Sequence, residues 1–224
     1  MIGLKFDALN ETLDDCARED TFIFYFSGHS LVRKGSLYLV LGDDKDKRSN
    51  LYSSDELINQ MRGCKAGSKL LMLDCCDAGQ SVYEWSPGND DNLRVLTATD
   101  RTERSKEFDD LKAGVFTYHF HQALTNPRLR RVDDTGVVDE NGTIWVNKLS
   151  GWLRQAIIAY GKKHQRNVPK SVFYGPDVQN MALVKGLTHY RHVFIPTELR
   201  NKLKSFTIVI SLRLCVGIEM LAYS

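Results

Sequence analysis

The sequence has little excess of charge of either sign, and this argues against one class of partner. It contains 30 Lys and Arg residues against 28 Asp and Glu residues, which gives a formal net charge of +2. Proteins that bind nucleic acids or anionic membranes do so largely through an excess of basic side chains. We therefore expect neither a nucleic acid nor a membrane as partner, and we expect the function to reside in a local site.

Cysteine is scarce, and its pattern excludes a disulfide framework. The chain has five cysteines, an odd number, and contains no Cys-x-x-Cys motif. Two of them, Cys75 and Cys76, are adjacent, and adjacent cysteines do not close an ordinary disulfide. Because structural disulfides belong to oxidising compartments, this pattern predicts a reducing, cytoplasmic location.

Long hydrophobic runs are missing as well. Residues 1–20 carry charges throughout and contain no apolar run, which is unlike a signal peptide. The longest apolar stretch, residues 206–223, is interrupted by Arg213 and Glu219. A membrane-spanning helix needs about 20 predominantly apolar residues, so we expect no membrane span. The glycine fingerprints of P-loop and Rossmann proteins are missing too.

Three nearly continuous apolar runs predict buried strands. They cover residues 21–27, 69–74 and 93–98. Such runs are typical of strands that are covered on both faces, as in a parallel sheet. Residues 171–174 predict a further strand. Residues 137–138 and 144–146 flank Asn141-Gly142, a combination that predicts a β-hairpin.

Helices are predicted between these strands. Ser53-x-x-Glu56 is a capping box, in which two side chains satisfy the first N–H groups of a helix. Apolar residues at helical spacing predict three more helices, over residues 6–17, 115–124 and 149–160. Strands separated by helices predict an α/β sandwich with a mainly parallel sheet. We expect one domain over residues 1–185 and a tail of unknown structure over residues 186–224.

Two of the predicted strands lead into residues that could carry chemistry. The first leads into Gly28-His29-Ser30, and the second into Cys75-Cys76. In open parallel sheets, functional groups lie just beyond the carboxyl ends of the strands. If the two strands are neighbours, His29 faces a cysteine of the pair, and an imidazole can activate a thiol for nucleophilic attack. The residues alone leave open which cysteine that is.

These segments resemble the caspase-like cysteine peptidases, in particular metacaspases and their bacterial relatives. In that family a Y-x-S-G-H-G segment supplies the histidine and a D-S-C-x-S-G segment the nucleophile. Here the segments read Tyr25-Phe26-Ser27-Gly28-His29 and Asp74-Cys75-Cys76-Asp77-Ala78-Gly79. Cys76 follows His29 by 47 residues, close to the roughly 50-residue spacing of this pair in such enzymes. The resemblance covers about residues 5–185 and implies a caspase-like three-layer sandwich.

The resemblance implies a cysteine endopeptidase with a Cys-His dyad, no cofactor, and a protein or peptide substrate. His29 matches the general base and Cys76 the nucleophile, while Cys75 takes the place of the family's serine. The backbone N–H groups of Ser30 and Cys76 match the oxyanion hole, which stabilises the negative oxygen of the tetrahedral intermediate.

The resemblance also implies cleavage after a basic P1 residue, the residue on the amino side of the cleaved bond. Asp74 matches an acidic residue of the S1 pocket that receives P1. Asp100 lies near a second acidic position, although Arg101 aligns there equally well. A carboxylate at the end of a strand is otherwise an ordinary capping or solvated group, and this alternative stays open for Asp74.

Three departures from the family pattern bear on this interpretation. Ser30 replaces a glycine and would crowd the loop if this position had a positive φ. Asp77 replaces a histidine or arginine. The family's first strand, helix and second strand would precede residue 1, which leaves the strand over residues 21–27 with an unpaired edge. We therefore expect an N-terminally incomplete domain that is fused to, or associated with, regulatory domains in the full-length protein.

Other interpretations are open at this stage. A catalytically inactive caspase-like interaction module, or a truncated pseudo-enzyme, would share the fold. Asp43, Asp44 and Asp46 suggest a calcium site of the kind that activates some metacaspases, although such clusters are more often turns. No metal-binding spacing of His and Cys is present, so no resident metal is expected. Reversible oxidation at Cys75–Cys76 is a third hypothesis.

Overall fold

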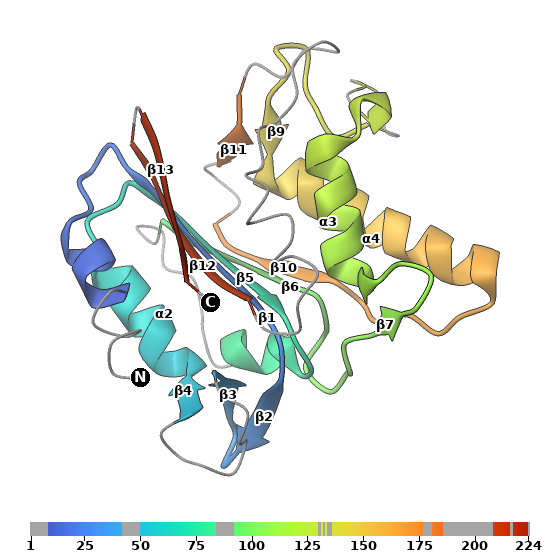
Figure 1. Ribbon diagram of the computed structural model, residues 1–224, viewed down its shortest axis with the longest axis horizontal. Helices are drawn as coiled ribbons and strands as arrows, with labels where there is room; N and C mark the ends of the chain where they lie inside the picture. Colours follow the sequence, from blue (N-terminus) through green and yellow to red (C-terminus); the bar gives the residue numbers. More distant parts are fainter. Residues whose placement is uncertain are drawn as a thin grey trace.

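The computed structural model describes residues 9–41, 50–83, 92–129, 131, 133, 136–176 and 181–185, and the strands of residues 208–215 and 217–223. Its centre is a six-stranded sheet in the order β10-β6-β5-β1-β12-β13 (Figure 1). The three central strands β1 (Thr21–Ser27), β5 (Ser68–Asp74) and β6 (Leu93–Thr97) are parallel, as their apolar runs predict. At one edge, β10 (Val172–Tyr174) is antiparallel to β6.

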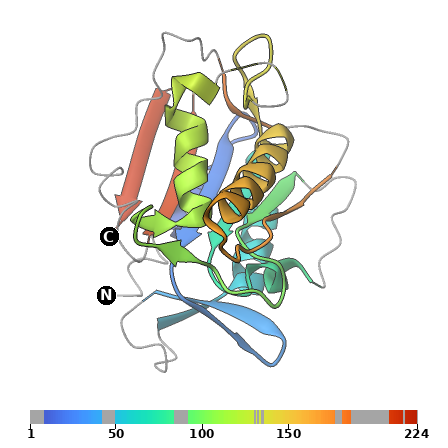
Figure 2. The ribbon, with the colours of Figure 1, turned by 90° about the vertical axis from the view of Figure 1, so that its right-hand side faces the viewer.

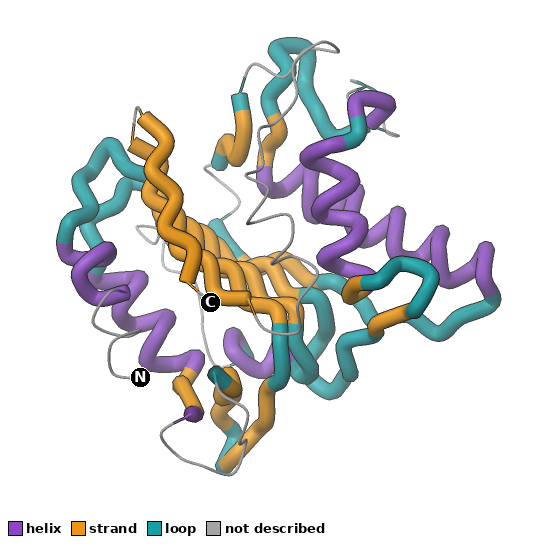
Figure 3. The backbone as a smooth tube through the Cα atoms, viewed as in Figure 1, coloured by secondary structure: helices purple, strands orange, loops and turns teal. Residues whose placement is uncertain are grey.

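Helices cover both faces of this sheet and make three layers. α2 (Ser54–Gly63) and the short helix of residues 9–14 lie on one face. α3 (Val115–Thr125) and α4 (Val146–His164) lie on the other (Figures 1 and 3). Figure 2 shows α3 and α4 side by side in front of the strands. The expected caspase-like α/β sandwich with parallel central strands is confirmed.

The alternation of side chains along β1 builds one apolar core on each face. Successive residues of a strand point to opposite sides, and here Phe22, Phe24 and Phe26 pack on the α2 side. Ile23 and Tyr25 pack on the α3–α4 side. All five side chains are buried, which is why this strand reads as a continuous apolar run rather than an alternating one.

Local signals mark the helix boundaries. The Ser53 hydroxyl accepts a hydrogen bond from the Glu56 N–H (3.4 Å) at the start of α2, as expected of the N-cap serine of a capping box. α3 ends just before Asn126-Pro127, where proline cannot continue the helix. α4 extends beyond its predicted range and ends at Gln165, whose φ of 51° is left-handed.

The hairpin predicted around residues 141–142 is wrong. β9 (Ile144–Trp145) pairs instead with β11 (Ala182–Val184), and residues 137–138 form no strand. The Asp139 carboxylate explains the difference, because it accepts hydrogen bonds from the N–H groups of Asn141 (2.9 Å) and Thr143 (2.8 Å). The carboxylate thus takes the Thr143 N–H that a strand pair would use, while the Asp139 N–H still donates to the Thr143 carbonyl oxygen (2.9 Å) and closes a turn.

A small second sheet, which the sequence did not predict, begins directly after the first strand. It consists of β2 (Ser30–Arg33), β3 (Ser36–Val40) and β4 (Leu51–Ser53), and extends from the lower end of the main sheet (Figure 2). Lys34 and Gly35 join β2 to β3 with φ values of 51° and 86°. Two positive φ values are the geometry of a type I′ hairpin turn, so this sheet depends on turn residues rather than on apolar runs.

Four short elements complete the main part of the fold. They are the 3-10 helices η2 (Ala78–Val82) and η3 (Pro127–Leu129) and the paired strands β7 (Glu107–Phe108) and β8 (Ala113–Gly114). η2 follows β5 at the carboxyl end of the sheet.

The C-terminal residues cover the edge of β1 that was expected to be unpaired. β12 (Ile208–Cys215) runs antiparallel to β1 in continuous register, from Thr21 opposite Leu214 to Ser27 opposite Ile208. β13 (Gly217–Tyr223) pairs with β12 and forms the outermost strand. The hydrogen-bonding groups of β1 are therefore satisfied on both sides, by β5 and by β12.

Candidate active site

The expected site residues follow neighbouring strands at one end of the sheet. β1 and β5 are parallel with Ser27 opposite Asp74, and the Gly28 N–H donates to the Asp74 carbonyl oxygen (3.1 Å). His29 and Cys76 each lie two residues beyond this pair. Because parallel strands end at the same edge, the topology brings His29 and Cys76 to neighbouring positions. The His29 side chain is exposed and that of Cys76 is half-buried.

The backbone on the histidine side is held by the small sheet. The Val40 N–H donates to the His29 carbonyl oxygen (2.9 Å), which ties His29 to β3. Ser30 is not among the residues with positive φ, which in the described part are Lys34, Asp77, Lys112 and Gln165 besides two glycines. The conformational freedom of glycine is therefore not needed at Ser30, and the condition for crowding is not met. The Ser30 hydroxyl instead donates to the Cys76 carbonyl oxygen (2.6 Å).

The backbone on the cysteine side forms a tight turn that Thr99 holds from the adjacent strand end. The Thr99 hydroxyl donates to the Cys75 carbonyl oxygen (3.1 Å) and accepts from the Ala78 N–H (2.8 Å). Asp77 has a left-handed φ of 53°, and its N–H donates to the Glu103 carbonyl oxygen (2.7 Å). The loop after β6 thus fixes the conformation of residues 75–78.

Gly79 allows the turn to approach that loop closely. A Cβ atom at this position would lie 2.8 Å from the Arg101 backbone nitrogen and 2.9 Å from the Asp100 carbonyl carbon. Since both neighbours are backbone atoms, neither can move aside cheaply. A larger residue would separate η2 from the loop after β6.

The two adjacent cysteines occupy different environments. Cys75 is fully buried in the core on the α2 side, and this burial raises the pKa of its thiol, while a hydrogen bond with Ser30 opposes the rise. A buried protonated thiol is a poor nucleophile. Cys76 is the member of the pair with solvent access.

Asp74 lies at the end of β5 in a buried network of hydroxyl groups. Its carboxylate accepts hydrogen bonds from the Ser105 hydroxyl (2.7 Å), the Thr117 N–H (3.2 Å) and the Thr117 hydroxyl (2.5 Å). The Thr117 hydroxyl also bonds with the Tyr25 hydroxyl. Burial raises the Asp74 pKa, and these hydrogen bonds lower it. Ser105 and Thr117 lie in stretches that share the family resemblance, but the sequence did not indicate their contact with Asp74.

Asp100 lies in the loop after β6 and is already paired with a cation. Its side chain is 39% exposed, and one carboxylate oxygen lies 3.6 Å from Lys170 Nζ. The other oxygen accepts from the Arg101 N–H (2.8 Å). The Arg101 guanidinium lies over the Tyr83 ring, 3.1 Å from the ring centroid, and donates to Gln80 (3.0 Å).

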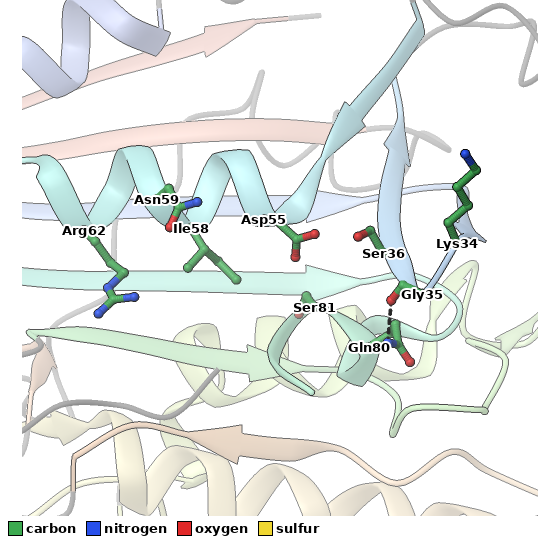
Figure 4. A pocket seen from close by; sticks show the side chains of 9 residues that line it. All are labelled: Lys34, Gly35, Ser36, Asp55, Ile58, Asn59, Arg62, Gln80 and Ser81. Atoms are coloured by element: carbon green, nitrogen blue, oxygen red, sulfur yellow. Dashed lines mark hydrogen bonds between the residues drawn. The ribbon is translucent and has the colours of Figure 1, made fainter. Parts of the chain in front are cut away.

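A polar pocket of about 370 Å³ is lined by residues of the β2–β3 turn, α2 and η2 (Figure 4). Gln80, one of these residues, donates to the Gly35 carbonyl oxygen (2.6 Å). Lys34, Asp55 and Arg62 place charges of both signs around it. None of the five expected site residues His29, Ser30, Asp74, Cys76 and Asp100 lines it.

Asp43, Asp44 and Asp46, the residues of the calcium hypothesis, lie outside the described residues. Within the described part of the chain, no group of three or more His, Cys, Asp or Glu residues is arranged to hold a metal ion. Nor does any helix in that part have the length and apolar character needed to cross a membrane.

Comparison with known proteins supports the resemblance to caspase-like proteins in general, but not to metacaspases in particular. The chain is similar to a paracaspase. It is 28% identical to that protein, from Dictyostelium discoideum, over 111 residues, which are 46% of this chain and 26% of the paracaspase. The chain thus spans about a quarter of the length of this relative. No family model matches the chain. The similarity to this paracaspase is therefore distant and covers only part of each chain.

Proposed function

We propose that this protein is a cysteine endopeptidase that cleaves peptide bonds with Cys76 and His29. The observation that carries the proposal is the register of β1 and β5, in which Ser27 lies opposite Asp74. Equal offsets from this pair bring an exposed imidazole and a solvent-accessible thiol to the same end of the sheet. The distant similarity to a paracaspase supports the same reaction class.

The reaction would proceed in two steps. The Cys76 sulfur attacks the carbonyl carbon of the scissile bond while His29 takes the thiol proton, and the resulting tetrahedral intermediate carries an oxyanion. The C–N bond then breaks, His29 gives its proton to the leaving amine, and an acyl-enzyme thioester is left. Water, deprotonated by His29, attacks the thioester, and the sulfur leaves with its electron pair to regenerate the thiol with the proton from His29.

Backbone donors at the two strand ends would stabilise the oxyanion. The Val40 N–H donates to the carbonyl oxygen of His29, which precedes β2, and Ser30 lies opposite Leu39 as the first pair of the β2–β3 ladder. This bond pattern is that of a non-hydrogen-bonded Ser30–Leu39 pair, so the Ser30 N–H points away from β3. With the Cys76 N–H it would form an oxyanion hole, where each donor typically contributes about 3–4 kcal/mol.

Asp74 supports a preference for Arg or Lys at P1. Its carboxylate is buried, and no cation among the described residues is paired with it. A buried carboxylate is stabilised by an opposite charge, which a basic P1 side chain would supply. Arginine is favoured over lysine, because its guanidinium binds a carboxylate with two parallel hydrogen bonds.

The test compares Cys76→Ala and Cys75→Ala on an unstructured fluorogenic peptide with Arg at P1. We expect Cys76→Ala and His29→Ala to lose cleavage, and Cys75→Ala to retain most of it. Thermal unfolding of each variant separates loss of catalysis from loss of the fold. Cleavage that survives in Cys76→Ala would exclude Cys76 as the nucleophile. No cleavage of any P1 variant by the folded wild-type chain would favour an inactive caspase-like module.

A further inference from the structure

The Ser30 hydroxyl joins the two halves of the candidate site. It donates to the Cys76 carbonyl oxygen at 2.6 Å, across 46 positions of sequence. Ser30 follows the histidine at the end of β1, and Cys76 lies in the turn after β5. The Ser30 side chain thus links the histidine segment to the turn that carries the two cysteines, and the family pattern has a glycine, without a side chain, at its position.

Two hydroxyls hold the peptide groups on either side of Cys76. Thr99 donates to the Cys75 carbonyl oxygen (3.1 Å), and this carbonyl shares a peptide plane with the Cys76 N–H. Ser30 donates to the carbonyl of the following peptide (2.6 Å). With both planes held, rotation about the backbone bonds of Cys76 is restricted, and so are the directions of its N–H and its thiol.

We propose that Ser30 is a positioning residue, whose hydroxyl holds the Cys76 peptide so that the N–H groups of Ser30 and Cys76 converge on the same oxyanion. This inference rests on the proposed peptidase function. It differs from the general role of the oxyanion hole, because it assigns a task to a side chain that replaces the family's glycine. The task is to fix the distance between two donors carried by different strand ends.

The experiment measures kcat and KM for Ser30→Ala, Ser30→Gly and Ser30→Thr on the P1-Arg peptide. Misplacement of a catalytic group by about 1 Å costs up to about 100-fold in rate. We expect kcat to fall about 10- to 100-fold in the Ala and Gly variants with KM within about threefold of wild type. Ser30→Thr keeps the hydroxyl and should recover most of kcat. Ser150→Ala is the matched control, because its hydroxyl also bonds a backbone carbonyl, that of Asn147 (2.8 Å), at an exposed position of α4 away from the site.

Two inhibitors distinguish positioning from a general structural effect. A peptide aldehyde forms a hemithioacetal with Cys76, whose oxygen occupies the oxyanion hole, whereas iodoacetamide alkylates the sulfur without forming an oxyanion. The Ala and Gly variants should bind the aldehyde more weakly in proportion to their loss of kcat, while alkylation stays within about twofold of wild type.

Three outcomes would overturn the inference. One is an unchanged kcat in Ser30→Ala. Another is slowing of alkylation in proportion to kcat, which would indicate a disturbed thiol rather than a disturbed oxyanion hole. The third is an absence of Cys76-dependent cleavage in the wild-type chain, which would overturn the proposed function and the role of Ser30 together. The first two outcomes would overturn only the role of Ser30. The proposed function would stand, because the wild-type chain would still be active.

Discussion

Ser27 lies directly opposite Asp74 in the parallel register of β1 and β5. This relationship determines the geometry of the candidate site, because His29 and Cys76 each follow their strand by two residues. A shift of register by one residue would turn the side chains of one strand to the other face of the sheet. The buried phenylalanines of β1 on one face and Tyr25 on the other prevent such a shift.

The burial of the cysteines predicts selective alkylation. Cys16, Cys64 and Cys75 are buried, and Cys76 is the more accessible one among the four cysteines whose side chains are described. We expect iodoacetamide to label Cys76 at least about tenfold faster than these three, as followed by peptide mapping with mass spectrometry. Cys76→Ser should leave them slow to react. Faster labelling of Cys75 would contradict the placement of that thiol in the core.

Asp74 and Asp100 should differ in their effect on P1 specificity. Asp74 is buried without a paired cation in the described part of the chain, whereas Asp100 is partly exposed beside Lys170. We expect Asp74→Asn to reduce the preference for Arg over Leu at P1 by about tenfold or more, and Asp100→Asn to reduce it less. A peptide library varied only at P1 measures both. If the two variants have equal effects, Asp74 is not the main P1 contact.

The raised pKa of Asp74 also predicts a pH effect on stability. Burial is the main cause of the shift, so the folded state favours the protonated acid more than the unfolded state does. Ionisation of Asp74 therefore makes an unfavourable contribution to the stability of the fold. This contribution is absent below the pKa of Asp74 in the unfolded state, and it grows as the pH rises through the pKa in the folded state. Asp74→Asn should therefore gain stability relative to wild type as the pH rises, in urea unfolding at several pH values. A constant difference would argue against this titration.

His119 should destabilise the fold in acid. Burial lowers its pKa to about 4, and its buried Nε2 has no hydrogen-bond partner among the residues that the structure describes. An unfolded histidine titrates near pH ~6.5, so the unfolded state binds a proton that the folded state does not. The free energy of unfolding should thus fall as the pH decreases from about 6.5 toward about 4. His119→Gln and His119→Phe should both lose this part of the pH dependence. If plots of the free energy of unfolding against pH are parallel for the wild type and both variants, His119 is not the cause of the pH dependence.

One glycine that caps a helix and one inside a helix should respond oppositely to alanine. A Cβ atom on Gly114, the N-cap of α3, would lie 2.7 Å from the Asp74 Oδ2 atom, whereas Gly151 in α4 has open space around that position. We expect Gly114→Ala to cost about 1–3 kcal/mol by overpacking. Gly151→Ala should gain about 0.5–1 kcal/mol from helix propensity. Chemical denaturation measures both, and a neutral Gly114→Ala would mean that the Asp74 network can move aside.

Removal of the two C-terminal strands should expose the edge of β1. β12 pairs with all seven residues of β1, while β13 contacts only β12 in the sheet. We expect a chain that ends at residue 207 to lose stability and to associate through the open edge, as seen by thermal unfolding and size-exclusion chromatography. A chain that ends at residue 216 keeps β12 and should be affected less. Equal behaviour of the two truncations would contradict the pairing of β12 with β1.

The sequence by itself determined the central strands, the main helices and the chemistry that follows the strands. Buried strands of a parallel sheet are continuous apolar runs, and a capping box is a contact within four residues, so both are visible locally. The sequence also placed His29 and Cys76 just beyond two such runs. It did not determine the pairing around residues 141–142, because the Asp139 side chain competes with the strand partner that the turn residues suggested.

Only the tertiary structure decided which partners these local elements have. The pairing of β1 with β12 joins segments near opposite ends of the chain, and main-chain hydrogen bonds of this kind leave no periodic signature in either segment. The burial of Cys75, the hydroxyl network around Asp74 and the bond from Ser30 to Cys76 likewise join residues that lie far apart in the sequence. Short-range patterns reflect the backbone's local preferences, whereas the environment of a side chain depends on every element that packs around it.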